Sequence, residues 1–155
     1  MPDLPNLKIL EISNFRNEGL PDGGWERLVA LQTLVLWECI GLKSLPYGLA
    51  QLQSLKDLRI YRCHSLKSLE YLYMGKFERL PGEEEGLGQL KKLNHLMIIS
   101  CRALRSLPHG LQPLSLLRVY ISDCPRLSKR CNVGGEDWHK ISHVPSITID
   151  EKRIQ

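Results

Sequence analysis

Residues 93–108 read LNHLMIISCRALRSLP, and this stretch decides the fold because its apolar pattern returns along the chain. The pattern is Leu-x-x-Leu-x-(Leu/Ile)-x-x-Cys-x-x-Leu, with valine accepted in its looser copies. The cysteine position is occupied five times, with phenylalanine in the first copy: Phe15, Cys39, Cys63, Cys101 and Cys124. Successive positions lie 24, 24, 38 and 23 residues apart. The chain is therefore built from repeated units.

Each unit contains a short alternating segment, such as Leu96-Met97-Ile98. In a β-strand this alternation directs successive side chains to opposite faces. A single unit cannot bury its leucines alone, whereas stacked units share a continuous core and a parallel sheet. Most of the steps fall within the roughly 20–29 residues that separate leucine-rich repeats. The sequence therefore predicts a leucine-rich-repeat solenoid of the α/β type.

The segment that follows each strand contains proline, as in Leu45-Pro46 and Leu107-Pro108. Proline interrupts regular hydrogen bonding, and leucines at three-residue spacing suit a 3-10 or irregular segment. Strands pack closer together than these bulkier segments. We therefore expect short parallel β-strands on the concave face and irregular or 3-10 segments on the convex face.

One solenoid of about five repeats is expected over residues 1–155. The step of 38 residues indicates an insertion around 70–86, which includes the acidic run Glu83–Glu85. We interpret the insertion as a convex-side excursion, and a complete extra repeat is the alternative. Near the N-terminus the leucine pattern begins almost at once, so the first coil is expected to have nothing stacked above it.

The end of the sequence differs from the repeats and predicts a cap over residues 128–155. Residues 134–141 suit a short helix, whose first turn would hold acidic side chains that favour the helix dipole. Val144, Ile147 and Ile149 then reproduce the strand pattern once more, before a charged tail. A last strand with a cover is how a solenoid closes its exposed end.

Composition excludes several classes of protein. The 155 residues carry a net charge of +4, and their lysines and arginines form no concentrated stripe, which argues against nucleic-acid binding. No apolar run approaches the ~20 residues that span a bilayer, and no signal peptide is evident. Five cysteines are an odd count that suits reduced thiols. We expect a cytoplasmic protein without membrane contact.

No motif in the sequence points to catalysis, a cofactor or a metal. Phosphate loops, nucleophile elbows and His-Glu-x-x-His are absent from it. The repeated cysteine is interpreted as a small buried packing residue. A zinc site is the alternative near the C-terminus, but its spacing lacks the tight cysteine knuckle of structural zinc sites; its four residues are Cys124, Cys131, His139 and His143.

The outward positions of the predicted strands are the candidate binding surface. Aromatic residues and arginine are the types enriched at the energetic centres of protein interfaces. The candidates are Trp37, Arg59, Tyr61, Met97, Ile99, Arg118 and Tyr120. Trp37, Tyr61 and Ile99 are expected to form one row across the strands. The alternative is that these side chains cover one another and bind nothing.

The repeat over residues 93–108 resembles those of plant nucleotide-binding leucine-rich-repeat disease resistance proteins. The tail is more specific: Cys124-Pro125-Arg126-Leu127 and the stretch GEDWHKISHVP at residues 135–145 are similar to the segment that ends the repeat domain in coiled-coil-type members. The resemblance covers essentially the whole chain. The coiled-coil and nucleotide-binding domains of that family are absent from it, so ATP binding is not carried over.

The resemblance implies a non-enzymatic recognition module that senses pathogen effectors and helps hold a receptor inactive. It implies a plant cytosolic or nucleocytoplasmic setting. The implied partner is a protein: an effector, a guarded host protein, or the nucleotide-binding domain of the same receptor. The alternative is a truncated structural fragment of such a receptor with no independent binding activity.

Overall fold

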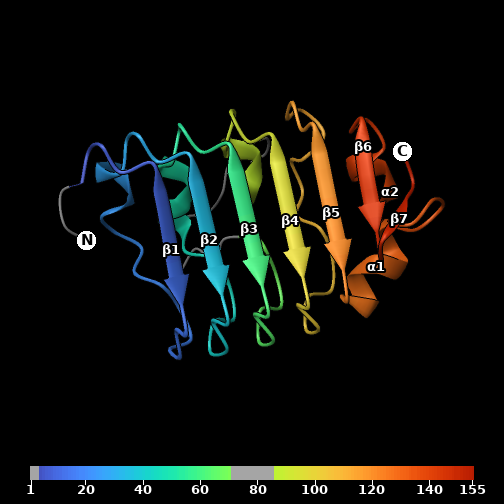
Figure 1. The fold of residues 1–155 in the computed structure, drawn as a ribbon, viewed down its shortest axis with the longest axis horizontal. Helices are drawn as coiled ribbons and strands as arrows, with labels where there is room; N and C mark the ends of the chain where they lie inside the picture. The colour runs from blue at the N-terminus through green and yellow to red at the C-terminus, as the bar shows by residue number, and fades with distance from the viewer. Residues whose placement is uncertain (1–3, 71–85) are drawn as a thin grey trace, which may run out of the picture.

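The computed structural model describes residues 4–70 and 86–155 and shows a seven-stranded sheet of the α/β class (Figure 1). The strands lie side by side in the order in which they occur along the chain. Neighbours from the first to the sixth strand pair in parallel, and the seventh returns antiparallel to the sixth. The strands are β1 (Ile9–Ser13), β2 (Thr33–Trp37), β3 (Asp57–Tyr61), β4 (His95–Ile99), β5 (Arg118–Ser122), β6 (Ser146–Ile149) and β7 (Lys152–Arg153).

Short helices follow the strands behind one face of the sheet (Figure 1). They are the 3-10 helices η1 (Trp25–Arg27), η2 (Tyr47–Gln51) and η3 (Gly86–Gln89), and the α-helices α1 (Pro125–Cys131) and α2 (Trp138–Ile141). A Cβ added to Gly48 of η2 would lie 1.9 Å from the carbonyl oxygen of Asp22, so only glycine allows this close approach. The predicted parallel strands and 3-10 segments are both present, an arrangement compatible with a leucine-rich-repeat fold.

The core lies between the sheet and these helices. Inward side chains of paired strands stand opposite one another without offset: Leu34 pairs with Leu58, which pairs with Leu96. Each of these is at most 1% exposed, whereas the outward side chains are half-buried or exposed. A shift by one residue would exchange the two sets, so burial of the leucines fixes the register.

A tight turn after each strand directs the chain into the core. Its first residue has a positive φ, as at Glu38 (52°) and Arg62 (53°). The amide of Glu38 donates to the carbonyl of Tyr61 at 2.9 Å, which links the turn to the next coil. Cysteine follows in the turns after β2, β3, β4 and β5. The thiol of Cys39 donates to the carbonyl of Ile12 in the preceding coil at 3.3 Å.

All five cysteines are buried and free of disulfide bonds. Burial raises the pKa of the Cys39 thiol to about 11 and that of the Cys131 thiol to about 12. These two thiols therefore stay protonated near neutral pH. The burial of all five cysteines agrees with the packing role predicted from the sequence for the repeated cysteine.

The C-terminal region differs in part from the prediction. Helix α1 begins at Pro125, before the predicted cap at 128–155, because Leu127 and Cys131 pack into the core. Helix α2 has no acidic residue in its first turn, so the predicted dipole interaction is wrong. The predicted last strand is confirmed as β6, while part of the expected charged tail forms β7.

Asp137 turns into the core instead of capping α2. Its carboxylate is 1% exposed, accepts the amide of Leu107 at 2.9 Å, and pairs with Lys140 at 3.0 Å and Arg130 at 3.2 Å. The ammonium of Lys140 donates to the carbonyl of Leu107 at 2.8 Å. This Asp137 cluster fastens both helices to the backbone of the preceding coil.

The side chain of Asp150 accepts hydrogen bonds from the turn that follows β5. In earlier coils the amide after the strand donates to the carbonyl of the next strand, as that of Ser100 does to Ser122. At the last such turn the amide of Asp123 donates to the carboxylate of Asp150 at 3.1 Å, and the hydroxyl of Ser128 donates to the same oxygen. The Asp150 side chain thus supplies the acceptor in place of the backbone carbonyl that the next coil supplies at the earlier turns.

The insertion predicted around 70–86 falls on residues 71–85, which lie outside the described residues. Within the ranges that are described, no helix is both long and apolar enough to cross a membrane.

We expect Asp137→Asn to lower the free energy of unfolding by about 2–4 kcal/mol, because it leaves Lys140 buried without its counter-ion. Urea unfolding followed by circular dichroism measures this loss. The matched control is Glu136→Gln, which removes the same charge. Glu136 also pairs with Arg130, but the Glu136 side chain is 74% exposed. The control should cost less than about 0.5 kcal/mol. Equal losses in the two variants would contradict the role of the Asp137 cluster.

The Asp137 cluster also predicts a pH dependence. Burial alone would raise the pKa of Asp137, but hydrogen bonds from Arg130, the Leu107 amide and Lys140 outweigh it and lower the pKa below the ordinary 3.8. The ionised carboxylate therefore stabilises the fold above that value, and this contribution is lost as the pH falls through the folded pKa. Between about pH 5 and pH 3 the wild type should lose more stability than Asp137→Asn in urea titrations. Parallel pH profiles would contradict the assignment.

Candidate functional site

The outward side chains of β1–β6 form a surface that we call the exposed sheet face. All seven residues predicted as a binding surface lie on it, because strand alternation keeps them out of the core. The pairing register aligns Trp37 with Tyr61 and Tyr61 with Ile99, so these three stand in one row. Their role in binding stays a prediction.

Aromatic contacts order this row. The rings of Trp37 and Tyr61 lie with centroids 5.1 Å apart at an angle of 47°, and the hydroxyl of Tyr61 contacts the Met97 sulfur at 3.0 Å. The guanidinium carbon of Arg62 lies 5.7 Å from the centroid of the Trp37 ring. Such tilted ring pairs and cation–π contacts restrict side-chain motion, which lowers the entropy cost of binding.

A hollow of about 250 Å³ lies beside the row, over β3, β4 and β5. Both Nε and Nη2 of Arg59 donate to Oδ2 of Asp57, at 3.1 and 2.5 Å. This pairing raises the pKa of Arg59. Arg118, on the opposite side of the hollow, is exposed, and its guanidinium has no hydrogen bond or ion pair with any residue in the described ranges. The lining is Asp57, Arg59, His95, Leu96, Met97, Arg118 and Tyr120.

Sequence reasoning placed Asp57 and His95 on the outward face but did not include them in the site. The period of two along the strands was the available signal, because it puts both residues in the same row as Arg118. The predicted alignment of the strands puts these residues in one row, but their grouping into one hollow also depends on how the side chains of β3, β4 and β5 pack.

A second hollow, of about 500 Å³, lies along the turns after β2–β5 and was not predicted. Its charges are largely neutralised: Arg62 pairs with Glu38 at 3.0 Å and Arg102 pairs with Asp123 at 3.3 Å. Hydrogen bonds from Ser100 and Arg102 lower the pKa of Asp123. The available sequence signal was the polar residue directly before each repeated cysteine, which has a positive φ in the structure and places one side chain per coil on this rim.

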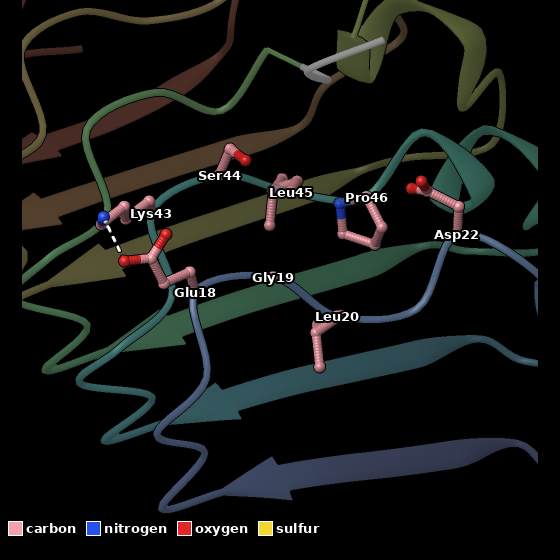
Figure 2. A pocket seen from close by; sticks show the side chains of 8 residues that line it. All are labelled: Glu18, Gly19, Leu20, Asp22, Lys43, Ser44, Leu45 and Pro46. Carbon is pink, nitrogen blue, oxygen red and sulfur yellow. Dashed lines mark hydrogen bonds and ion pairs between the residues drawn. The ribbon is translucent and has the colours of Figure 1, made fainter. Parts of the chain in front are cut away.

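A third hollow, of about 230 Å³, lies between residues 18–22 and 43–46 on the return side of the coils (Figure 2). Glu18 and Lys43 form an ion pair across it, and Asp22 accepts the backbone amide of Tyr47 at 3.1 Å. The hydroxyl of Ser44 has no hydrogen bond to a base in the part of the chain that the structure describes. A nucleophile needs such a partner, so the hollow offers no assembled catalytic pair.

The four residues of the zinc alternative are not brought together as a metal site. Among the described residues, no three histidine, cysteine or acidic side chains gather as metal ligands do. The thiol of Cys124 donates to the carbonyl of Ser122, and the ring of His143 contacts the carbonyl of Leu114 at 3.2 Å.

Parts of the chain are similar to three proteins of Solanum bulbocastanum. The identity is 65% to disease resistance protein RGA2 over 16% of this chain, 59% to the resistance protein RGA1 over 18%, and 44% to the resistance protein RGA4 over 28%. These stretches relate the chain to plant disease resistance proteins. They span only 3%, 3% and 5% of the length of the respective relatives. No family model matches the chain.

Proposed function

We propose that the chain is a non-enzymatic protein-recognition module in plant defence. It would belong to the effector-sensing or autoinhibitory leucine-rich-repeat region of a coiled-coil-type disease resistance protein, near the C-terminal end of that region. The observation that carries this proposal is the exposed sheet face, whose row of Trp37, Tyr61 and Ile99 is ordered but not used by the core. Partial similarity to resistance proteins supports the setting.

Residues 1–155 are proposed to be one leucine-rich-repeat solenoid with the exposed sheet face on its concave side. In-register parallel strands, repeated positive-φ turns and repeated buried cysteines support this architecture. The Asp137 cluster and the Asp150 carboxylate support a closing cap at the β6 end, because both join this region to the coils before it through side-chain hydrogen bonds.

The proposed partner is a protein: an effector, a guarded host protein or the nucleotide-binding domain of the same receptor. Exposed Trp37 with Arg59 and Tyr61 offers the residue types that dominate binding energies at protein interfaces. A cytoplasmic setting is proposed because five free thiols suit a reducing compartment. The ion-paired or backbone-bound charges in the hollows favour recognition over catalysis.

The second candidate is a structural fragment whose only contact is another coil at β1. One observation favours it: the inward side chains Leu10 and Ile12 of β1 are half-buried, whereas Leu34 and Leu36 of β2 are 0% exposed. Leu7 and Phe15 beside them are also only partly buried. In this case the exposed sheet face would bind nothing.

The two candidates differ in what a triple alanine variant at Trp37, Arg59 and Tyr61 would do. Under the recognition proposal it should weaken binding more than tenfold, since hot-spot residues each contribute about 2 kcal/mol or more. The measurement is retention of proteins from Solanum bulbocastanum leaf extract on the immobilised chain, quantified by mass spectrometry. Circular dichroism should stay unchanged.

The matched control replaces one basic, one aliphatic and one aromatic residue on the other side of the coils: Arg27, Val29 and Tyr47, each changed to alanine. Proteins recognised by the exposed sheet face should be retained by this control and lost from the first variant. Equal retention by both variants would contradict recognition through this face and favour the structural fragment.

A further inference from the structure

The hollow over β3–β5 has an unbalanced charge. Arg59 and Arg118 contribute two guanidinium groups, and Asp57 is the one carboxylate in the lining. Asp57 is only 15% exposed and its Oδ2 atom already accepts two donors from Arg59. An uncompensated cation that faces solvent in a hollow favours an incoming anion.

The strands on either side of the hollow, β2 and β6, do not neutralise this positive charge. On β2, Thr33 and Val35 are the neighbours of Asp57 and Arg59. On β6, Ser146 and Thr148 are the neighbours of Arg118 and Tyr120. Because these four side chains are neutral, the nearest strands bring no second carboxylate to Arg118.

The size of the hollow limits its occupant. About 250 Å³ lies below the roughly 300–1,000 Å³ of pockets that hold drug-sized ligands. Its floor includes the buried Leu96, and its walls offer the hydroxyl of Tyr120 and the imidazole of His95 beside the arginines. One short acidic side chain fits this volume and these donors. A nucleic acid would instead need a stripe of cations along the surface.

The apolar row sets a second requirement. Tyr61 and Ile99 lie two residues along their strands from Arg59 and Met97, and four residues from Asp57 and His95. With a rise of about 3.3 Å per residue, the row therefore lies about 7–13 Å from the residues that line the hollow. An extended peptide covers that distance in two to four residues.

We propose that this hollow is a subsite for the side-chain carboxylate of a protein partner, which carries Asp or Glu two to four residues before or after a large apolar residue. Arg118 binds the carboxylate, Arg59 and Tyr120 flank it, and the apolar residue rests on the row of Trp37, Tyr61 and Ile99. This assignment rests on the proposed function, because it names the chemistry of the partner that the exposed sheet face recognises.

The test titrates the ¹⁵N-labelled chain with the peptide acetyl-Glu-Ser-Leu-Leu-Ser-amide and follows backbone amide shifts by NMR. The comparison peptide has Gln in place of Glu. We expect shifts in β3, β4 and β5, with the Glu peptide bound about three- to tenfold more tightly than the Gln peptide, the range for a partly exposed charged hydrogen bond. A hexathymidylate control should bind more weakly than the Glu peptide.

Arg118→Gln should abolish the preference for Glu. Arg102→Gln is the matched control, since it removes the same charge from a residue that is 67% exposed and lies on the rim outside the hollow. This control should keep the preference. Equal loss in both variants would show a response to net charge alone and overturn the subsite, as would tighter binding of hexathymidylate or no shift at the solubility limit of the peptide.

Trp37→Ala separates the subsite from the proposed function. If the Glu and Gln peptides bind equally and Trp37→Ala weakens both, the carboxylate subsite is wrong and recognition by the exposed sheet face stands. If the peptides bind equally and Trp37→Ala changes neither, both proposals are wrong. Supporting both requires a preference for Glu that depends on Arg118, together with overall binding that depends on Trp37.

Discussion

Mutual burial of the leucine rows is the constraint on which the rest of this structure depends. One coil exposes its apolar side chains on both flanks, so each coil buries them only by stacking on its neighbours. Leu34, Leu58 and Leu96 therefore stand opposite one another with no offset. The zero offset in turn aligns every outward position, so the rows of the exposed sheet face are a consequence of packing on its other side.

The same constraint explains why the β6 end contains buried charge. The region from α1 to β6 packs against the coils that begin with β4 and β5, whose buried amides and carbonyls need partners because unpaired buried polar groups are costly. Asp137 and Lys140 satisfy the amide and carbonyl of Leu107, and Asp150 satisfies the amide of Asp123. At the β1 end, by contrast, Leu10 and Ile12 are only half-buried. The two ends of the sheet thus have different chemistry.

The exposed sheet face combines an ordered apolar row with an unbalanced pair of arginines. The row owes its order to the Trp37–Tyr61 ring contact and to the Met97 sulfur under the Tyr61 hydroxyl. The hollow has an excess of positive charge because its one carboxylate, Asp57, pairs with Arg59. The guanidinium of Arg118 has no acidic partner among the described residues. A surface with anchors and one directional charge can specify both the register and the identity of a bound segment.

The sequence by itself determined the strands, their side-chain alternation and the seven outward candidates, because a period of two and a repeat of 23–24 residues are local properties of the chain. Only the tertiary structure decided that Asp57, His95 and Arg118 line one hollow, since the shape of the hollow depends on how their side chains pack and not on the repeat alone. It also decided the role of Asp137, because the local sequence pattern predicted an interaction of its carboxylate with a helix dipole. Leu107, its partner, lies 30 residues away, and no local periodicity encodes a hydrogen bond over that separation.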